Sequence, residues 1–217
     1  MRFYIADDLK HDLEQAKKNL NAQYVRRWCD AIPVDEVKGD SEKCPLCNRP
    51  ISMLKWLEPR KMRLTNSKYP DRLTAWLSEP MVISEKFKKA YEQEGLIGIK
   101  KFIPIEVVKI ARVTKNSPKT LKYFSAKIGY TSNIRVDVAK TVIIGQKHDW
   151  SCELCNPWGT TIDRIVKLSL TVSEWKGEDV FKVFSLPAHV IVSEKFYNFV
   201  QRQNFTNFNL VPVVSTN

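Results

Sequence analysis

Strand-like patterns of hydrophobic and polar residues recur along most of this chain. β-Branched and aromatic residues concentrate in six segments that we expect to form strands: 102–113, 121–128, 134–144, 165–172, 179–184 and 208–214. Residues 2–6 alternate in the same way. The pattern predicts an α+β fold, in which a mostly antiparallel sheet carries a few short helices.

Helical spacing is confined to short segments. Apolar side chains recur every three or four residues over 9–24, and Pro70 begins a second short helix that ends before Pro80. The stretch 34–42 is polar and contains Gly39, so we expect it to be a loop.

Two further helices are expected where the sequence Ser-Glu-Lys-Phe occurs, at Ser84 and again at Ser193. Serine is a good helix N-cap, and the glutamate that follows it places negative charge in the first turn. Gly95 ends the first helix and Asn204 ends the second, because these residue types best tolerate a left-handed C-cap. Both segments therefore use the same capping residues.

The repeated helix belongs to a longer internal repeat. The pattern Cys-x-Leu-Cys-Asn begins at Cys44 and at Cys152, 108 positions apart, and the two Ser-Glu-Lys-Phe segments are 109 positions apart. Two shorter matches follow in the same order, which predicts an internal duplication. We divide the chain into an N-terminal half, residues 1–110, and a C-terminal half, residues 111–217, packed together as one unit.

Four cysteines carry the clearest chemistry: Cys44, Cys47, Cys152 and Cys155. Two thiolates separated by two residues can bind one metal ion from a single tight turn. Two such turns supply the four sulfurs of a closed, tetrahedral Zn²⁺ site. We therefore predict one structural zinc ion per chain, shared by the two turns. Since protein ligands fill all four positions, no water can bind the metal and it is not expected to be catalytic.

Other interpretations of the cysteine pairs stay open. A CxxC pair is also typical of a redox dithiol, although that motif normally starts a helix after a strand. His148 and Asp149 lie just before the second pair and are further candidate ligands. Three basic residues can offset the negative charge of a tetrathiolate centre: Lys43, Arg49 and Lys147. The fifth cysteine, Cys29, is expected to be a small buried apolar residue.

The chain is strongly basic, with a formal net charge of +11, and both halves share the excess. Residues 107–136 contain no acidic residue. Candidate partner-binding residues in or beside this basic window are Lys109, Arg112, Lys115, Lys119, Lys122 and Lys127. Such a surface attracts an acidic protein or a nucleic acid. An ordinary solvated face is the alternative.

Recognisable active-site motifs are missing from the sequence. It has no P-loop, no dinucleotide-binding glycine pattern, no HExxH and no GxSxG, and it has only three histidines. Asp163, Glu178 and Asp179 are interpreted as solvated turn residues. We expect a protein that is not an enzyme. The absence of a signal peptide and of a long apolar span favours the cytoplasm, where thiols stay reduced and bind metal.

Together these motifs resemble the double-CXXCG family of bacterial proteins, and the resemblance covers nearly the whole chain. Family members begin with a Met-Arg-Phe-type strand, here Met1-Arg2-Phe3, and carry two CxxCG turns about a hundred residues apart. Each turn is followed by a Ser/Thr-Glu-Lys/Arg-Phe helix. The family glycine after each second cysteine is Asn48 in one turn and Asn156 in the other. Asparagine is the next-best residue for a left-handed turn, so we expect both turns to keep their geometry.

The resemblance implies a function that composition does not. Members of the family are similar to immunity proteins of bacterial toxin systems, which protect the cell by binding a cognate toxin. The expected partner is therefore a toxin domain, with an acidic surface opposite the basic window. A nucleic-acid-binding zinc protein is the main alternative, suggested by the charge and by the aromatic residues of the window. A redox enzyme is a third.

Overall fold

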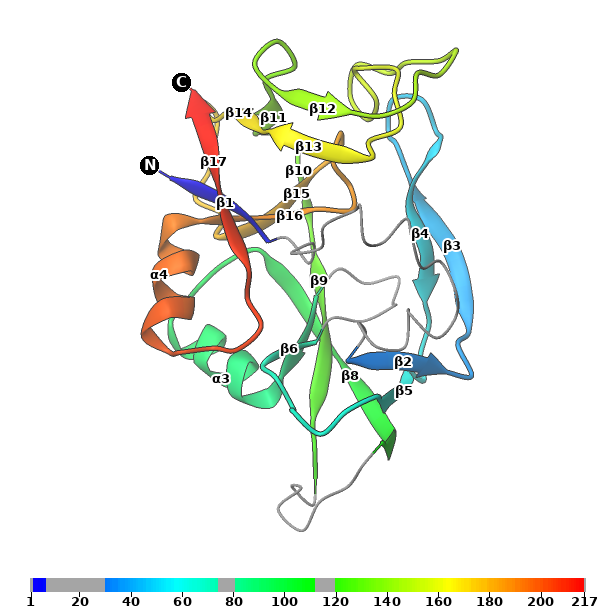
Figure 1. Ribbon diagram of the computed structural model, residues 1–217, viewed down its shortest axis with the longest axis vertical. Helices are drawn as coiled ribbons and strands as arrows, with labels where there is room; N and C mark the ends of the chain where they lie inside the picture. Colours follow the sequence, from blue (N-terminus) through cyan, green and yellow to red (C-terminus); the bar gives the residue numbers. More distant parts are fainter. Residues whose placement is uncertain (1, 7–29, 74–80, 112–119, 217) are drawn as a thin grey trace.

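The computed structural model of the chain describes residues 2–6, 30–73, 81–111 and 120–216 (Figure 1). Over these ranges the chain is mostly β, with curled mixed sheets and two short helices, which is compatible with the predicted α+β class. Neither helix in the described part has the length and apolar character needed to cross a lipid bilayer.

The larger sheet has seven strands. Their order is β10 (Tyr130–Thr131), β15 (Val180–Val183), β16 (Val190–Ser193), β1 (Phe3–Ala6), β17 (Leu210–Thr216), β14 (Ser169–Thr171) and β11 (Arg135–Val136). The β10–β15 and β14–β17 pairs are parallel, and the others are antiparallel. Alternate side chains of this sheet build a core around Phe3, Leu170 and Ile191.

The second sheet has six strands. Their order is β2 (Ala31–Val34), β5 (Lys61–Leu64), β8 (Ile99–Ile110), β9 (Tyr123–Ile128), β7 (Val82–Ser84) and β6 (Arg72–Leu73). The β5–β8 pair is parallel, and the other pairs are antiparallel. Trp56, Met62 and Tyr123 are central to the core on one face of this sheet.

Two separate antiparallel hairpins carry the cysteine pairs. The first consists of β3 (Lys38–Lys43) and β4 (Pro50–Trp56), and the second of β12 (Val142–Ile144) and β13 (Arg164–Lys167). The prediction of a loop over 34–42 is therefore wrong at Val34, which ends β2, and from Lys38 onward. Most side chains of β3 are exposed or half-buried, so the strand lacks the apolar alternation that reveals strands in sequence.

Both Ser-Glu-Lys-Phe segments form the predicted helices, α3 (Glu85–Gln93) and α4 (Glu194–Arg202). The hydroxyl of Ser84 accepts a hydrogen bond from the N–H of Phe87, and Ser193 does the same for Phe196. Gly95 and Asn204 have φ values of 65° and 50°. The predicted N-caps and left-handed ends of both helices are thus confirmed.

Most of the predicted strands are present, with changed limits. Segment 134–144 is divided into β11 and β12 by a turn, and 165–172 is divided into β13 and β14. The helix predicted to begin at Pro70 is wrong at its start, because Arg72 and Leu73 pair with β7 as strand β6. The remainder of that segment and the predicted helix over 9–24 lie outside the described residues.

Two helix-bearing assemblies can be compared: strands β16, β1 and β17 with helix α4, and strands β7, β9 and β8 with helix α3. In each assembly the central strand comes from the other half of the chain. Strand β1 lies between β16 and β17, and β9 lies between β7 and β8. The registers match: Phe3 is opposite Ser193 and Val213, whereas Tyr123 is opposite Ser84 and Ile105. Each half therefore places its own opening strand in the sheet of the other. The division at 110/111 separates the sequence repeats but not the sheets.

A shared core joins the two assemblies where α3 and α4 face each other. It includes Met81 and Phe87 from the first half, and Val190 and Phe196 from the second. The rings of Phe87 and Phe196 lie 6.0 Å apart between centroids, although they hold the same position in the two Ser-Glu-Lys-Phe segments. Because this apolar surface is buried by both halves at once, exposing it by separating them is costly.

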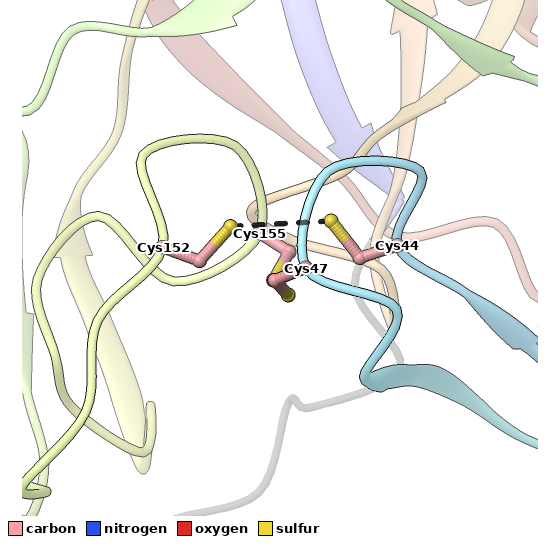
Figure 2. Close-up of side chains that lie close together, drawn as sticks. All are labelled: Cys44, Cys47, Cys152 and Cys155. Carbon is pink, nitrogen blue, oxygen red and sulfur yellow. Dashed lines mark hydrogen bonds between the residues drawn. The ribbon is translucent and has the colours of Figure 1, made fainter.

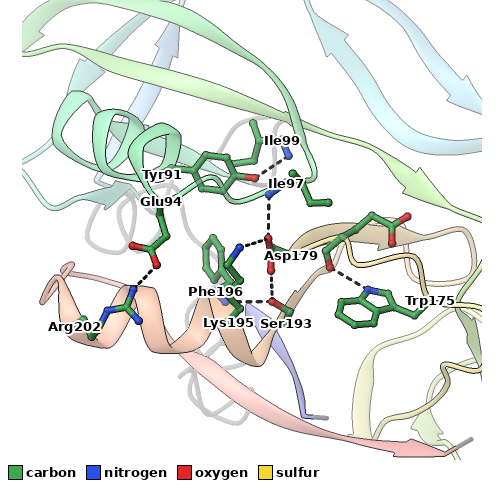
Figure 3. A network of polar contacts seen from close by, with 11 residues as sticks. Tyr91, Glu94, Ile97, Ile99, Trp175, Asp179, Ser193, Lys195, Phe196 and Arg202 are labelled. Atoms are coloured by element: carbon green, nitrogen blue, oxygen red, sulfur yellow. Dashed lines mark hydrogen bonds and ion pairs between the residues drawn. The ribbon is translucent and has the colours of Figure 1, made fainter.

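Two buried aspartates link the halves reciprocally. Asp179 accepts hydrogen bonds from the Ser193 hydroxyl at 2.7 Å and from the N–H of Ile97, just after α3, at 3.0 Å (Figure 3). Asp71 accepts from the Ser84 hydroxyl at 2.9 Å and from the N–H of Thr206, just after α4, at 3.1 Å. Each carboxylate thus orients the N-cap of one helix and holds the end of the other.

The same reciprocity extends to the first turns of the helices. The ammonium group of Lys195 lies 3.8 Å from the carboxylate of Asp179, and that of Lys86 lies 3.9 Å from Asp71. The interpretation of Asp179 as a solvated turn residue is wrong, since only 3% of its surface is exposed. Asp71 and Asp179 are 108 positions apart, the same spacing as Cys44 and Cys152. Alignment of the two halves at this spacing could therefore have identified both aspartates as equivalent.

Exchange of the central strands predicts that neither half folds alone. Fragments 1–110 and 111–217, produced separately, should each lack a cooperative unfolding transition, because each lacks the middle strand of its helix-bearing assembly and half of the shared core. Refolded together, they should form one complex. Thermal unfolding followed by circular dichroism checks this, and cooperative unfolding of either fragment alone would contradict it.

The buried carboxylates predict a second effect. Asp179→Asn removes a charge-assisted acceptor from Ser193 and Ile97, so it should lower the free energy of unfolding by about 1–3 kcal/mol. The matched control is Asp163→Asn, the same change at an exposed position, which should stay within about 0.5 kcal/mol of the parent. Urea titrations measure both, and equal effects would show that Asp179 has no special role.

Candidate metal centre

The structure brings together the four cysteines that the sequence singles out. The sulfur atoms of Cys44 and Cys152 are 4.0 Å apart, and those of Cys47 and Cys155 are 3.5 Å apart (Figure 2). All four sulfurs lie within 4.8 Å of one another. Each close pair joins corresponding cysteines of the two turns, so the turns face each other.

These separations match what one metal ion requires. Four thiolates that bind Zn²⁺ at about 2.3 Å in a tetrahedron are separated from one another by about 3.8 Å. The separations of 3.5 and 4.0 Å fall on either side of that value. The cluster has the geometry to bind one metal ion and is compatible with zinc. In the described part of the chain, His148 and Asp149 do not belong to the cluster.

Backbone hydrogen bonds shape the first turn at the end of hairpin β3–β4. The N–H of Cys44 donates to the carbonyl of Arg49 at 2.8 Å, and the N–H of Asn48 donates to the carbonyl of Cys44 at 2.9 Å. Asn48 has a φ of 57°, in the left-handed region. The turn therefore keeps its shape with asparagine at this position, as expected.

The second turn uses its asparagine differently. Cys152 and Asn156 exchange backbone hydrogen bonds at 2.9 and 3.0 Å. Asn156 does not have a positive φ, so the expectation of a left-handed residue is wrong here. Its buried side-chain oxygen instead accepts a hydrogen bond from the N–H of Thr160 at 3.0 Å. This bond ties the turn to the segment that follows it.

The environment of the sulfurs differs within each pair. Cys44 and Cys152 are buried, whereas Cys47 and Cys155 are partly exposed. Desolvation opposes ionisation of Cys152, but hydrogen bonds from the backbone N–H groups of Cys155 and Leu154 outweigh it and lower its pKa to about 7. Desolvation and hydrogen bonding with Cys47 raise the pKa of Cys155. Without a metal, Cys152 is therefore ionised more readily than Cys155.

The charged neighbours of the turns are at the surface. Lys43, Arg49 and Lys147 are exposed, and the guanidinium of Arg49 lies 4.3 Å from the centre of the Trp150 ring. This contact joins the first turn to the loop that precedes the second. His148 is hydrogen-bonded through its Nε2 to the hydroxyl of Thr161.

The basic window is only partly described. Lys109 lies on β8 opposite Arg63, and Lys127 lies on β9; both are exposed. The ammonium of Lys122 is 3.3 Å from the carboxylate of Glu85, and this hydrogen bond lowers the pKa of Glu85. Arg112, Lys115 and Lys119 lie outside the described residues, as does Cys29.

The cluster predicts one metal ion per chain and a dependence of the fold on it. Loss of a residue that only supports a metal ligand typically weakens metal affinity about 10–100-fold. Cys47→Ser removes a direct ligand, so it should weaken metal affinity by more than that. It should also lower the melting temperature, since metal binding contributes to folding. Metal analysis and thermal unfolding measure these effects. Cys29→Ser is the matched control, and similar metal loss in both variants would contradict the assignment.

Comparisons with known proteins add nothing to this geometry. The chain matches no protein-family model and no curated protein sequence. Any function assigned to the chain therefore depends on the four cysteines, the surrounding charge and the fold that holds them.

Proposed function

We propose that this chain is a non-catalytic immunity protein that binds and neutralises a bacterial toxin domain in the cytoplasm, and that one structural zinc ion holds it in shape. The observation that carries the proposal is the four-cysteine cluster. It unites the two turns on which the resemblance to the double-CXXCG family depends. The other elements of that resemblance support it: the opening strand is β1, and both Ser-Glu-Lys-Phe segments are capped helices.

Zinc is the metal that this donor set favours. Tetrahedral sulfur-only sites are typical of zinc or of iron, and a reduced cytoplasm keeps thiolates available for them. Because four protein ligands complete the tetrahedron, the ion would have no open position for substrate. Its role would be to hold together two hairpins that are distant in sequence.

We further propose that the two halves descend from one duplicated unit. The matched registers of β1 and β9, the equivalent N-caps and the reciprocal aspartates support this origin. Duplication of a unit whose first strand pairs with a second copy explains why the opening strands are exchanged. Such a protein resembles a strand-swapped dimer joined into one chain.

The basic window is the proposed face for an acidic toxin surface. Lys109 and Lys127 are exposed and form no ion pair among the described residues. Lys122 forms an ion pair with Glu85. Exposed charges of this kind accelerate association with an oppositely charged partner more than they increase final affinity. They therefore suit an inhibitor that must capture its target quickly.

Nucleic-acid binding is the second candidate, favoured by the net charge of +11. The aromatic residues of the window argue against it. Tyr123 is 2% exposed and donates its hydroxyl hydrogen to the carbonyl of Pro70, while Tyr130 stacks on Phe184. Side chains in these positions are not available to stack on bases, as single-strand recognition requires.

A growth assay tests the proposal directly. The gene is expected to lie beside that of a toxin, and co-expression should restore growth to cells that produce it. A double variant, Lys109→Glu with Lys122→Glu, should slow association with the toxin by about tenfold at low salt and reduce its salt dependence. The control carries the same change at two exposed lysines elsewhere, Lys167 and Lys176.

Two results would contradict this function. One is failure of the protein to protect cells from the neighbouring gene product. The other is tight binding to mixed-sequence RNA or DNA that persists at physiological salt, because micromolar and steeply salt-dependent binding is common to basic proteins.

A further inference from the structure

A small cavity lies where hairpin β3–β4 meets strands of both large sheets. Its volume is about 170 Å³. The hairpin contributes Glu42, Ser52 and Lys55, and the two sheets contribute Lys127 from β9 and Lys182 from β15. Arg60, which follows the hairpin, also lines the cavity, and the rest of the wall is apolar: Met53, Trp56, Leu57, Ile103 and Ile128. Three parts of the fold therefore meet at this cavity.

The cavity has a strong excess of positive charge. Four cationic side chains line it, namely Lys55, Arg60, Lys127 and Lys182, and Glu42 is its single carboxylate. Lys55 and Lys127 are exposed at the surface and form no ion pair among the described residues. Low-dielectric walls concentrate the field of such charges, so the cavity attracts small anions.

Two of the cations are held in place by the core. Lys182 is only 7% exposed, and its ammonium lies 4.0 Å from the carboxylate of Glu42 and 4.3 Å from the centre of the Tyr130 ring. Arg60 is also 7% exposed; it donates a hydrogen bond to the carbonyl of Trp56, and its guanidinium is 5.6 Å from that ring. Fixed donors lose little entropy when they bind a ligand.

We propose that this cavity is a binding site for a tetrahedral oxyanion, either free phosphate or the phosphate group of a monoester. Its volume is below the roughly 300–1,000 Å³ usual for drug-sized ligands, so the cavity accommodates the charged group and leaves any remainder outside. A guanidinium beside several ammonium groups is the donor set that phosphate oxygens require. Lys127 of the proposed toxin-binding face also lines this cavity, but phosphate binding there does not require the toxin.

Isothermal titration of the metal-loaded protein with inorganic phosphate tests the site. Binding should persist when potassium chloride keeps the ionic strength constant. Lys127→Gln should weaken it by about tenfold, because one charge-assisted contact is lost. Lys176→Gln removes an equally exposed lysine that does not line the cavity and should change the affinity less than twofold. Metal analysis and thermal unfolding verify that both variants remain folded.

Further ligands identify the source of the phosphate group and expose a wrong assignment. Tighter binding of glycerol 3-phosphate than of inorganic phosphate would indicate a monoester ligand, and the reverse order would indicate the free ion; either supports the site. Three results would overturn it: no heat of binding beyond that of chloride, equal affinity for acetate and phosphate, or equal loss of affinity in Lys127→Gln and Lys176→Gln.

Discussion

The exchange of strands β1 and β9 is the constraint on which the rest of the structure depends. An inner strand of a sheet pairs on both sides, and here each inner strand at the middle of a helix-bearing assembly is supplied by the opposite half. A shift of one residue would turn the buried side chains of Phe3 or Tyr123 to the wrong face. The pairing therefore fixes the position of α3 relative to α4 and, through the connected hairpins, the position of the cysteine turns.

Local signals in the sequence predicted the parts of the molecule that depend on local chemistry. The cysteine spacing identified the cluster, and serine followed by glutamate identified both helix starts, because metal turns and N-caps are formed by residues close together in the chain. Strand exchange was not predictable in this way. Nothing in the short apolar sequence Phe3–Ala6 specifies which of the two large sheets it will join, since its pairing partners lie far away in the chain.

Residue type alone gave a wrong prediction for a polar residue that has a structural role in the interior. Asp179 was assigned to solvent because carboxylates are seldom buried. In the fold its charge is compensated by a hydroxyl, a backbone N–H and the nearby Lys195, so burial is tolerated. The hairpin strand β3 shows the opposite case. It is a strand without a hidden face, and its sequence therefore looks like a loop.

The cysteine cluster is important because it holds one end of the exposed hairpin β3–β4 against the rest of the fold. An isolated two-stranded hairpin is marginally stable in water, and β3–β4 buries few side chains of its own. Trp56, which is fully buried, anchors one end, and Cys44 anchors the other through the sulfur cluster. Because Glu42, Ser52 and Lys55 line the cationic cavity from this hairpin, a metal ion at the cluster would also hold one wall of the cavity in place. Oxyanion affinity should then fall when the metal is removed, which couples two sites that share no residue.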